Sequence, residues 1–135
     1  MIKTERGVDV VAGLKNAEAI QEGRDFERAM IGKAKAEGKD VRTQVRLVPQ
    51  NGQGNVKGNR TNVDQLIRNE DGSYTLVETK LRSTTPLSKG QKAAKRQIEE
   101  GNGLFEVRND ELRDWGIKNG DFIIIDNWDF NSKYK

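Results

Sequence analysis

The chain has 135 residues, of which 33% are charged and 33% apolar, so its length suits one domain with a modest core. Its net charge is only +3, from 24 Lys and Arg against 21 Asp and Glu, which permits a polyanionic partner without requiring one. Cysteine and histidine are absent, which excludes disulfides, cysteine nucleophiles, histidine bases and the usual structural zinc sites. No apolar run approaches the roughly 20 residues of a membrane span, so no membrane segment is expected.

The first helical pattern runs from Leu14 to about Glu37. We expect Gly23 to divide it, with Asp25 favouring the start of the second part. The apolar side chains of that part share one sector of the helical wheel, formed by Phe26, Met30, Ile31 and Ala34. Glu27 falls inside this sector, where a carboxylate needs a partner or belongs to a site. The alternative is that Glu27 lies at the sector's edge and pairs with a Lys or Arg in solvent.

A half-buried strand is predicted next, because residues 41–48 alternate between apolar and polar side chains. The loop that follows, Pro49 to Asn59, is rich in Gly and Asn, contains Lys57 and is followed by Arg60. Such a loop either connects two strands and does nothing more, or lies along a groove and contacts a backbone phosphate. Its composition is compatible with both interpretations.

Residues 60–81 form the central feature of the sequence, two strands joined by a tight turn. Asp64 lies on the first strand, while Glu78 and Lys80 lie two apart on one face of the second. A three-residue loop, 70–72, would place Gly72 in the left-handed conformation and Asp64 directly opposite Glu78. A two-residue turn at positions 71–72 would instead pair Asp64 with Thr79 and send Glu78 to the other face. The convergence of the two carboxylates therefore depends on the turn.

A second helix is expected from Leu87 or Ser88 to Glu100. Ser88 and Gln91 match a capping box, with Ser at the cap and Gln three residues later. Gln91 also falls on the apolar face of the helix, and the helix is the most basic element of the chain, with Lys89, Lys92, Lys95 and Arg96. In one interpretation Gln91 only caps the helix and the lysines are solvated. In the other, Gln91 and Lys95 reach a site beside the sheet.

The remaining segments are shorter. A strand is predicted at Leu104–Val107 and one or two helical turns at residues 109–115. The run from Phe122 to Ile125 is typical of a strand buried on both faces. We expect residues 126–135 to be an irregular tail whose Trp128 and Tyr134 pack on the sheet edge.

This order of elements, with an E-x-K sequence at residues 78–80, an upstream Asp64, a helical Glu27 and a helical Gln91, resembles the PD-(D/E)XK nuclease superfamily. The resemblance covers about Arg24 to Val107, and Val63 stands where the name of the motif has proline. It implies an α/β (α+β) fold with a restriction-endonuclease-like αβββαβ core, in which helices flank a mixed central sheet. A single domain would span residues 1–135, with its core at about 14–125.

The resemblance implies that Asp64 and Glu78 bind a metal, that Lys80 is the catalytic lysine, and that Glu27 and Gln91 support them. Two close carboxylates repel each other unless a proton or cation lies between them, and their hard oxygens suit Mg²⁺ or Mn²⁺. Zn²⁺ would be a poorer match without His or Cys. The alternative is a surface ion pair between Lys80 and one of these carboxylates, worth about 0–1 kcal/mol.

Small domains with these motifs also resemble the C-terminal toxin domains of bacterial contact-dependent and other polymorphic toxin systems. This implies a DNA endonuclease delivered into the cytoplasm of a target cell and neutralised by a cognate immunity protein. An RNase that cleaves tRNA, a non-catalytic nucleic-acid- or protein-binding module and a cytoplasmic repair nuclease are the alternatives. The cations expected to contact nucleic acid are Lys57, Arg60, Arg82, Lys92 and Lys95.

Overall fold

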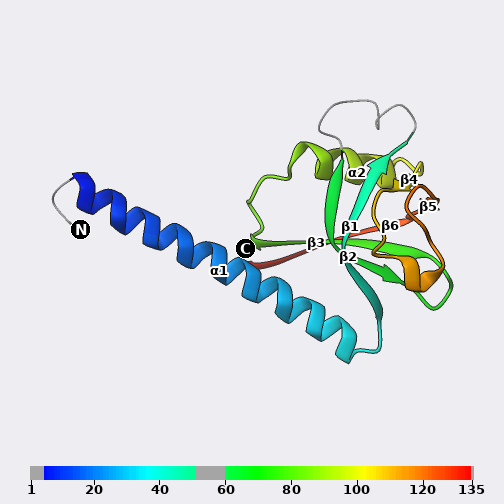
Figure 1. The fold of residues 1–135 in the computed structure, drawn as a ribbon, viewed down its shortest axis with the longest axis horizontal. Coiled ribbons are helices and arrows are strands. Elements are labelled where there is room, and N and C mark those ends of the chain that lie inside the picture. The colour runs from blue at the N-terminus through cyan, green and yellow to red at the C-terminus, as the bar shows by residue number, and fades with distance from the viewer. Residues whose placement is uncertain (1–4, 51–59, 135) are drawn as a thin grey trace.

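The structure is a computed structural model that describes residues 5–50 and 60–134, with side chains described from residue 17 onward. It contains two helices and six strands, and Figure 1 shows how they are arranged. In chain order the elements are α1 (Glu5–Ala36), β1 (Asp40–Pro49), β2 (Thr61–Arg68), β3 (Tyr74–Arg82), α2 (Lys89–Glu99), β4 (Leu104–Val107), a 3₁₀ turn η1 (Arg113–Trp115), β5 (Phe122–Ile124) and β6 (Asn127–Tyr134).

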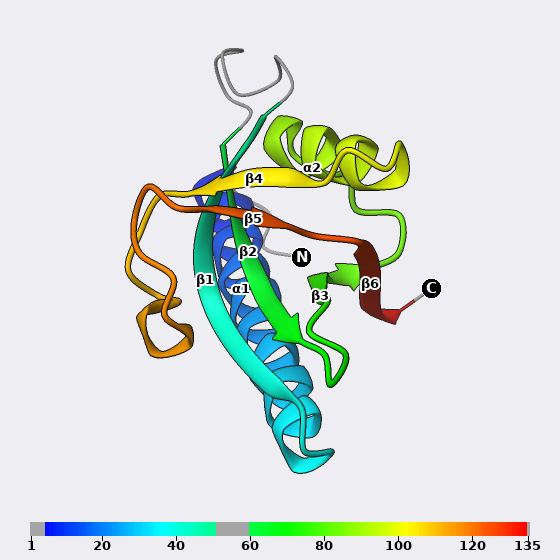
Figure 2. The same cartoon turned by 90° about the vertical axis from the view of Figure 1, so that its right-hand side faces the viewer.

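The six strands form one mixed sheet in the order β5-β4-β1-β2-β3-β6. Every neighbouring pair is antiparallel except β3 and β6, which run parallel. In Figure 2, β1 and β2 are seen as a long curved pair, with α1 behind them and α2 near β4. The expected α+β fold, a mixed sheet with flanking helices, is confirmed at this level.

The buried apolar side chains form two clusters on the sheet. The larger one joins α2 to the sheet and consists of Val45, Leu47, Val63, Leu66, Leu76, Ala94, Ile98, Phe105, Val107, Leu112, Ile123 and Ile125. The smaller one, under α1, consists of Ala34, Val41, Ile67 and Val77. Both helices therefore pack through a few apolar side chains, and the polar site described below lies on the strands that both clusters share.

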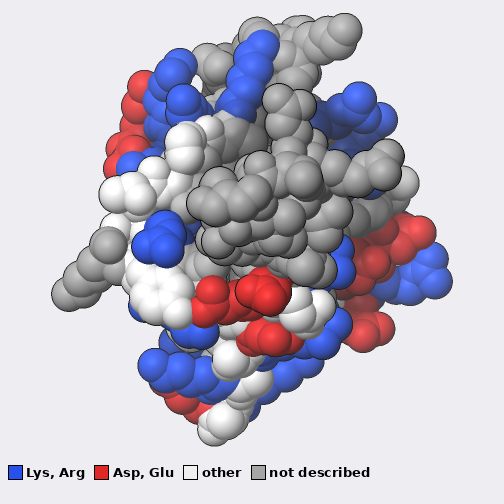
Figure 3. Space-filling view, turned by 90° about the vertical axis from the view of Figure 1, so that its left-hand side faces the viewer, with Lys and Arg blue, Asp and Glu red and all other residues white. Residues whose placement is uncertain are grey.

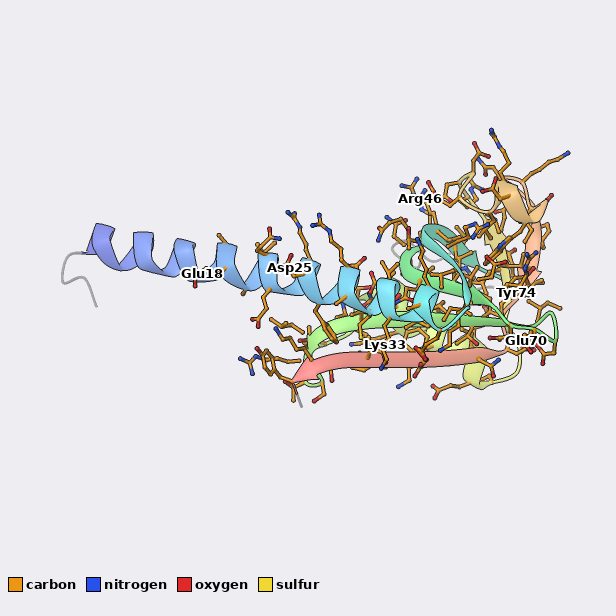
Figure 4. All side chains as sticks on the ribbon, turned by 90° about the horizontal axis from the view of Figure 1, so that it is seen from below. Glu18, Asp25, Lys33, Arg46, Glu70 and Tyr74 are labelled. Atoms are coloured by element: carbon orange, nitrogen blue, oxygen red, sulfur yellow. The ribbon has the colours of Figure 1, made fainter. Side chains whose placement is uncertain are left out.

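The first helix is longer than predicted and is not divided. It runs without a break from Glu5 to Ala36, and Gly23 lies inside it. Gly costs a helix only about 1 kcal/mol relative to Ala, so one Gly in a long run of helix-forming residues does not end it. Figure 4 shows the C-terminal half of α1 running alongside β3 and β6, and Glu22 accepts hydrogen bonds from Lys133 and Tyr134 at 2.9 and 2.5 Å. No described helix is apolar enough over a sufficient length to cross a membrane.

The central hairpin has the three-residue loop. The paired residues run from Arg68↔Tyr74 to Gln65↔Val77, and Asn69 donates its N–H to Ser73 at 2.8 Å. Gly72 has φ of 85°, the left-handed conformation that this loop requires at that position. The two-residue alternative is therefore excluded. The ladder ends at Gln65↔Val77, one position before the predicted pair of Asp64 with Glu78.

Four other predicted elements are confirmed. β1 extends the predicted strand by one residue at each end, and β4 has the predicted bounds. α2 begins after Ser88, which forms the complete capping box with Gln91. The 109–115 segment contains a single 3₁₀ turn.

Two predictions for the C-terminal part are wrong. β5 is not buried on both faces: it is an edge strand, in which Phe122 and Ile124 are 58% and 60% exposed while Ile123 is buried. A short apolar run does not reveal whether its strand lies at the centre or the edge of a sheet. Residues 126–135 were expected to be irregular, but β6 occupies 127–134 and pairs with β3 along its length. Its polar sequence lacks strand alternation, so its pairing with β3 is a tertiary effect.

Candidate metal-dependent active site

The candidate site lies where β2 and β3 separate. The backbone pairing of β2 with β3 stops at Gln65↔Val77. Beyond it, a backbone N–H of β3 donates to the Asp64 carboxylate instead of to a backbone carbonyl of β2. Asp64 Oδ2 accepts the N–H of Thr79 at 2.8 Å. This bond fixes Asp64 against the second strand, on the patch that Glu78 occupies. The separation of the strands opens a place for side chains between them.

Glu78 is the buried acid of the site. Its side chain has 0% exposure, Oε2 accepts a hydrogen bond from Gln91 Nε2 at 2.9 Å, and Oε1 has no hydrogen-bond partner. Burial raises the pKa of Glu78 to about 9, with a further contribution from the negative charge of Asp64, while Lys80 acts in the opposite direction. In the absence of a cation this carboxyl is therefore protonated at neutral pH.

Glu27 reaches the same site from α1. It is half-buried and accepts a hydrogen bond from Gln44 Nε2 at 3.1 Å. Burial raises the pKa of Glu27, the charge of Asp64 raises it further, and the bond from Gln44 opposes both. Glu27 therefore faces the site rather than a Lys or Arg in solvent, which was the alternative.

Gln44 is a site residue that sequence reasoning missed. It lies on β1 between the pairs Thr43↔Gln65 and Val45↔Val63, so it is opposite Asp64 in the register. Its φ is 54°, a left-handed conformation that is strained for a residue other than Gly. Its carbonyl accepts a bond from Asn109 Nδ2 at 2.9 Å, which holds this conformation. The hairpin register together with the alternation of residues 41–48 was the signal that could have placed Gln44 beside Asp64.

Gln91 both caps α2 and contacts Glu78. Its Oε1 accepts the N–H of Ser88 at 2.9 Å as part of the capping box. Its Nε2 donates to Glu78, so the same amide caps α2 and holds the buried carboxyl. The remaining oxygen of Glu78 is left without a partner.

Lys80 lies two residues after Glu78, on the same face of β3, and is half-buried. Its charge acts on Glu78, lowering the pKa of that carboxyl. With the described acids it forms no ion pair. The surface ion pair that was the alternative for Lys80 is therefore not formed among these residues.

The donor set suits a hard divalent cation. Asp64 and Glu78 supply carboxylate oxygens, and the Oε1 atom of Glu78 is buried without a hydrogen bond, which is costly unless a proton or cation compensates it. Among the described residues, no group of three or more acids forms a metal site. A cation here would therefore have two carboxylate ligands, with water or substrate oxygens completing its shell.

The predicted nucleic-acid contacts are spread over several elements. Arg60 is exposed just before β2, Arg82 is exposed at the end of β3 and lies 5.3 Å from the Tyr134 ring, and α2 carries Lys92 and the half-buried Lys95. Lys57 lies outside the described residues. Figure 3 shows Lys and Arg patches interspersed with Asp and Glu patches on the face from which α1 projects. The coloured part of this face carries no continuous field of one sign.

Comparison of the chain with known protein families, with curated proteins and with solved structures gives no match. The site is therefore argued from its own geometry and chemistry.

Proposed function

We propose that the chain is a divalent-metal-dependent endonuclease that hydrolyses phosphodiester bonds in DNA, with the site arrangement of the PD-(D/E)XK superfamily. Glu78 carries the proposal: this fully buried carboxyl feels the charge of Asp64, and its Oε1 atom accepts no hydrogen bond. A buried carboxyl of this kind destabilises a fold, so its presence between a second carboxylate and a lysine favours a functional role. The order α1–β1–β2–β3–α2–β4 supports a restriction-endonuclease-like core.

Each polar side chain has a role in this proposal. Asp64 and Glu78 would hold Mg²⁺ or Mn²⁺, which when bound supplies charge neutralisation and an acidified water. Lys80 stabilises negative charge on the phosphate from the same face of β3. Glu27, held by Gln44, orients a water at the edge of the site. Gln91 fixes the rotamer of Glu78.

On the basis of the sequence resemblance, the proposal also holds that the chain is delivered as an interbacterial toxin domain. An immunity protein would be its inhibitor. Such a function has a direct consequence for living cells. Expression of the intact site in the bacterial cytoplasm should arrest growth and fragment the chromosome, while the Lys80→Ala chain should be tolerated. If growth arrest comes with intact chromosomal DNA and cleaved tRNA, the substrate is RNA.

The activity is tested with purified chain, supercoiled plasmid and total RNA, each with Mg²⁺ or with chelator. We expect Mg²⁺-dependent nicking of the plasmid that falls by at least about 100-fold in Lys80→Ala and in Glu78→Gln, because each removes a group that acts on the transition-state charge. Glu78→Gln keeps the size and polarity of the buried side chain, so its circular dichroism should match the wild type.

Arg113→Gln is the matched control, because Arg113 lies in η1 and its only described ion pair, with Asp110, is exposed. It should cleave like the wild type. Unchanged nicking in Glu78→Gln, or nicking that persists in chelator, would contradict the proposal. Cleavage of RNA alone would keep the site and change the substrate.

A further inference from the structure

A second polar feature continues from the site along β1 and β2. A pocket of about 360 Å³ is lined by Arg46, Arg60, Thr61 and Asn62. Arg46 Nε donates to Asn62 Oδ1 at 3.3 Å, which joins the two strands across the pocket. Of the predicted site residues only Arg60 lines it, and neither Asp64 nor Glu78 does.

The pocket lies along the same two strands as the site residues Asp64 and Gln44. Along β2, Arg60, Asn62 and Asp64 alternate with the buried residues 61 and 63. Along β1, Gln44 and Arg46 alternate with the buried residues 45 and 47. Asn62 is two residues from Asp64 and Arg46 is two residues from Gln44, so the pocket begins one step along the ribbon from these site residues. Two residues of strand correspond to about 6.6 Å and four to about 13 Å, a distance that a nucleic-acid strand covers in a few nucleotides.

The charges of the pocket are not compensated by the described residues. The arginines at positions 42, 68, 108 and 113 pair with acids. Arg46 and Arg60 form no ion pair with any acid in the described ranges, and the partner of Arg46 is a neutral amide. Figure 4 labels Arg46 at the outer surface of the sheet, open to solvent. Two guanidinium groups beside an amide match the oxygens of a phosphate diester.

We propose that this pocket binds a non-scissile phosphate of the nucleic-acid backbone and so sets the position of the strand over the Asp64–Glu78 site. The inference rests on the proposed function, because it assigns the pocket to the same substrate. Asn62 positions the Arg46 guanidinium, and Arg60 contacts the phosphate from the start of β2. The contact is independent of base sequence, since it uses only backbone oxygens.

The test compares wild type, the double variant Arg46→Gln/Arg60→Gln and the Arg113→Gln control. Binding of a fluorescent single-stranded DNA 16-mer and of its RNA equivalent is measured by anisotropy in Ca²⁺ over a range of salt concentrations. Loss of two charge-assisted contacts should weaken binding by at least about 10-fold. It should also reduce the slope of log K against log salt by about 1.4. In Mg²⁺, the loss in cleavage should fall on KM rather than kcat.

The outcomes separate the two proposals. Cleavage by the wild type with an unchanged salt slope and KM in the double variant would overturn the pocket and keep the nuclease. Binding that weakens in the double variant, from a wild type that cleaves nothing, would keep the pocket and overturn the nuclease. Inorganic phosphate is the third probe: if it raises the Tm of the wild type but not of the double variant, and neither oligonucleotide binds, the pocket takes free phosphate and the nucleic-acid assignment is wrong.

Discussion

At the scale of single residues, the molecule concentrates its electrostatic cost at Glu78. Folding removes this carboxyl from water and places it near Asp64 and Glu27, both of which disfavour its charged form. Lys80 offsets only part of that cost. The folded chain without metal therefore holds a proton at Glu78 that the unfolded chain releases near its usual pKa of 4.5.

Stability in chelator should consequently fall as the pH rises. The pKa of Glu78 is raised on folding, so its contribution is fully present below about pH 4.5 and is lost progressively towards pH 9. Between pH 5 and 8 we expect a loss on the order of 3 kcal/mol relative to Glu78→Gln, which has no proton to lose. Urea unfolding of the two chains at several pH values measures this difference. Parallel pH profiles would contradict a buried, protonated Glu78.

Mg²⁺ should reverse the effect. A cation at Asp64 and Glu78 displaces the proton, so binding at pH 7 should release about one proton and raise the free energy of unfolding. Calorimetry in two buffers of different ionisation enthalpy counts the proton. Glu78→Gln serves as the control, and equal proton release from both chains would place the metal elsewhere.

The residues of this site differ in how well the sequence predicts them. Asp64 and Glu78 are predictable because one local turn, with its Gly at position 72, fixes their register. Strand register could also have placed Gln44 beside Asp64, but not its left-handed φ, which depends on Asn109, far along the chain. Arg46 and Asn62 look like the exposed positions of any alternating hairpin. Their pocket depends on the pairing of β1 with β2.

At the scale of elements, the start of α2 and the site depend on one amide. Gln91 completes the capping box of Ser88 and also donates to Glu78. A helix cap contributes about 1 kcal/mol, and the contact with a buried carboxyl adds to it. The sequence predicts both roles separately but does not show that a single rotamer satisfies both.

Gln91→Ala and Ser88→Ala should therefore separate the two roles. Both variants lose the capping box and about 1 kcal/mol of stability, as measured by urea unfolding. Only Gln91→Ala leaves Glu78 Oε2 without its donor, so cleavage should fall by about 10-fold or more in that variant alone. Equal activity in the two variants would show that Gln91 acts only as a cap.

At the scale of the whole molecule, the fold depends on β6, a strand that local sequence patterns do not predict. β6 is polar, with exposed or half-exposed side chains throughout, yet it pairs with β3 from Thr75↔Asn127 to Arg82↔Tyr134. Trp128 is its main apolar contribution and packs against the larger core. Local sequence patterns predict β1, β4 and the hairpin, because the signals for each of these elements lie within a few consecutive residues. They do not predict β6 or the exposure of β5, which are set by distant partners.

Removal of β6 should unfold the whole sheet, and not merely shorten it by one strand. A chain that ends at Asp126 loses the parallel partner of β3 and the packing of Trp128, so we expect it to lose cooperative thermal unfolding. Circular dichroism during heating and hydrogen exchange at residues 74–82 measure this. Lys133→Ala is the control, since it removes only the solvent-exposed contacts of Lys133 with Glu22 and the Tyr134 ring and should keep the cooperative transition. A cooperative transition in the shortened chain would contradict the structural role of β6.

The parallel pairing of β3 with β6 also determines when the site is completed during folding. A three-residue loop joins β2 to β3, so the edge of β3 that faces β2 can pair early in folding. Its other edge pairs with β6, which lies far along the chain and is available only later. Val77 and Thr79 flank Glu78 and pair with Asp129 and Asn131. A chain still emerging from the ribosome would already contain every side chain of the candidate site and yet hold β3 by one edge only. Activity should therefore be acquired late, at the step in which the last strand docks.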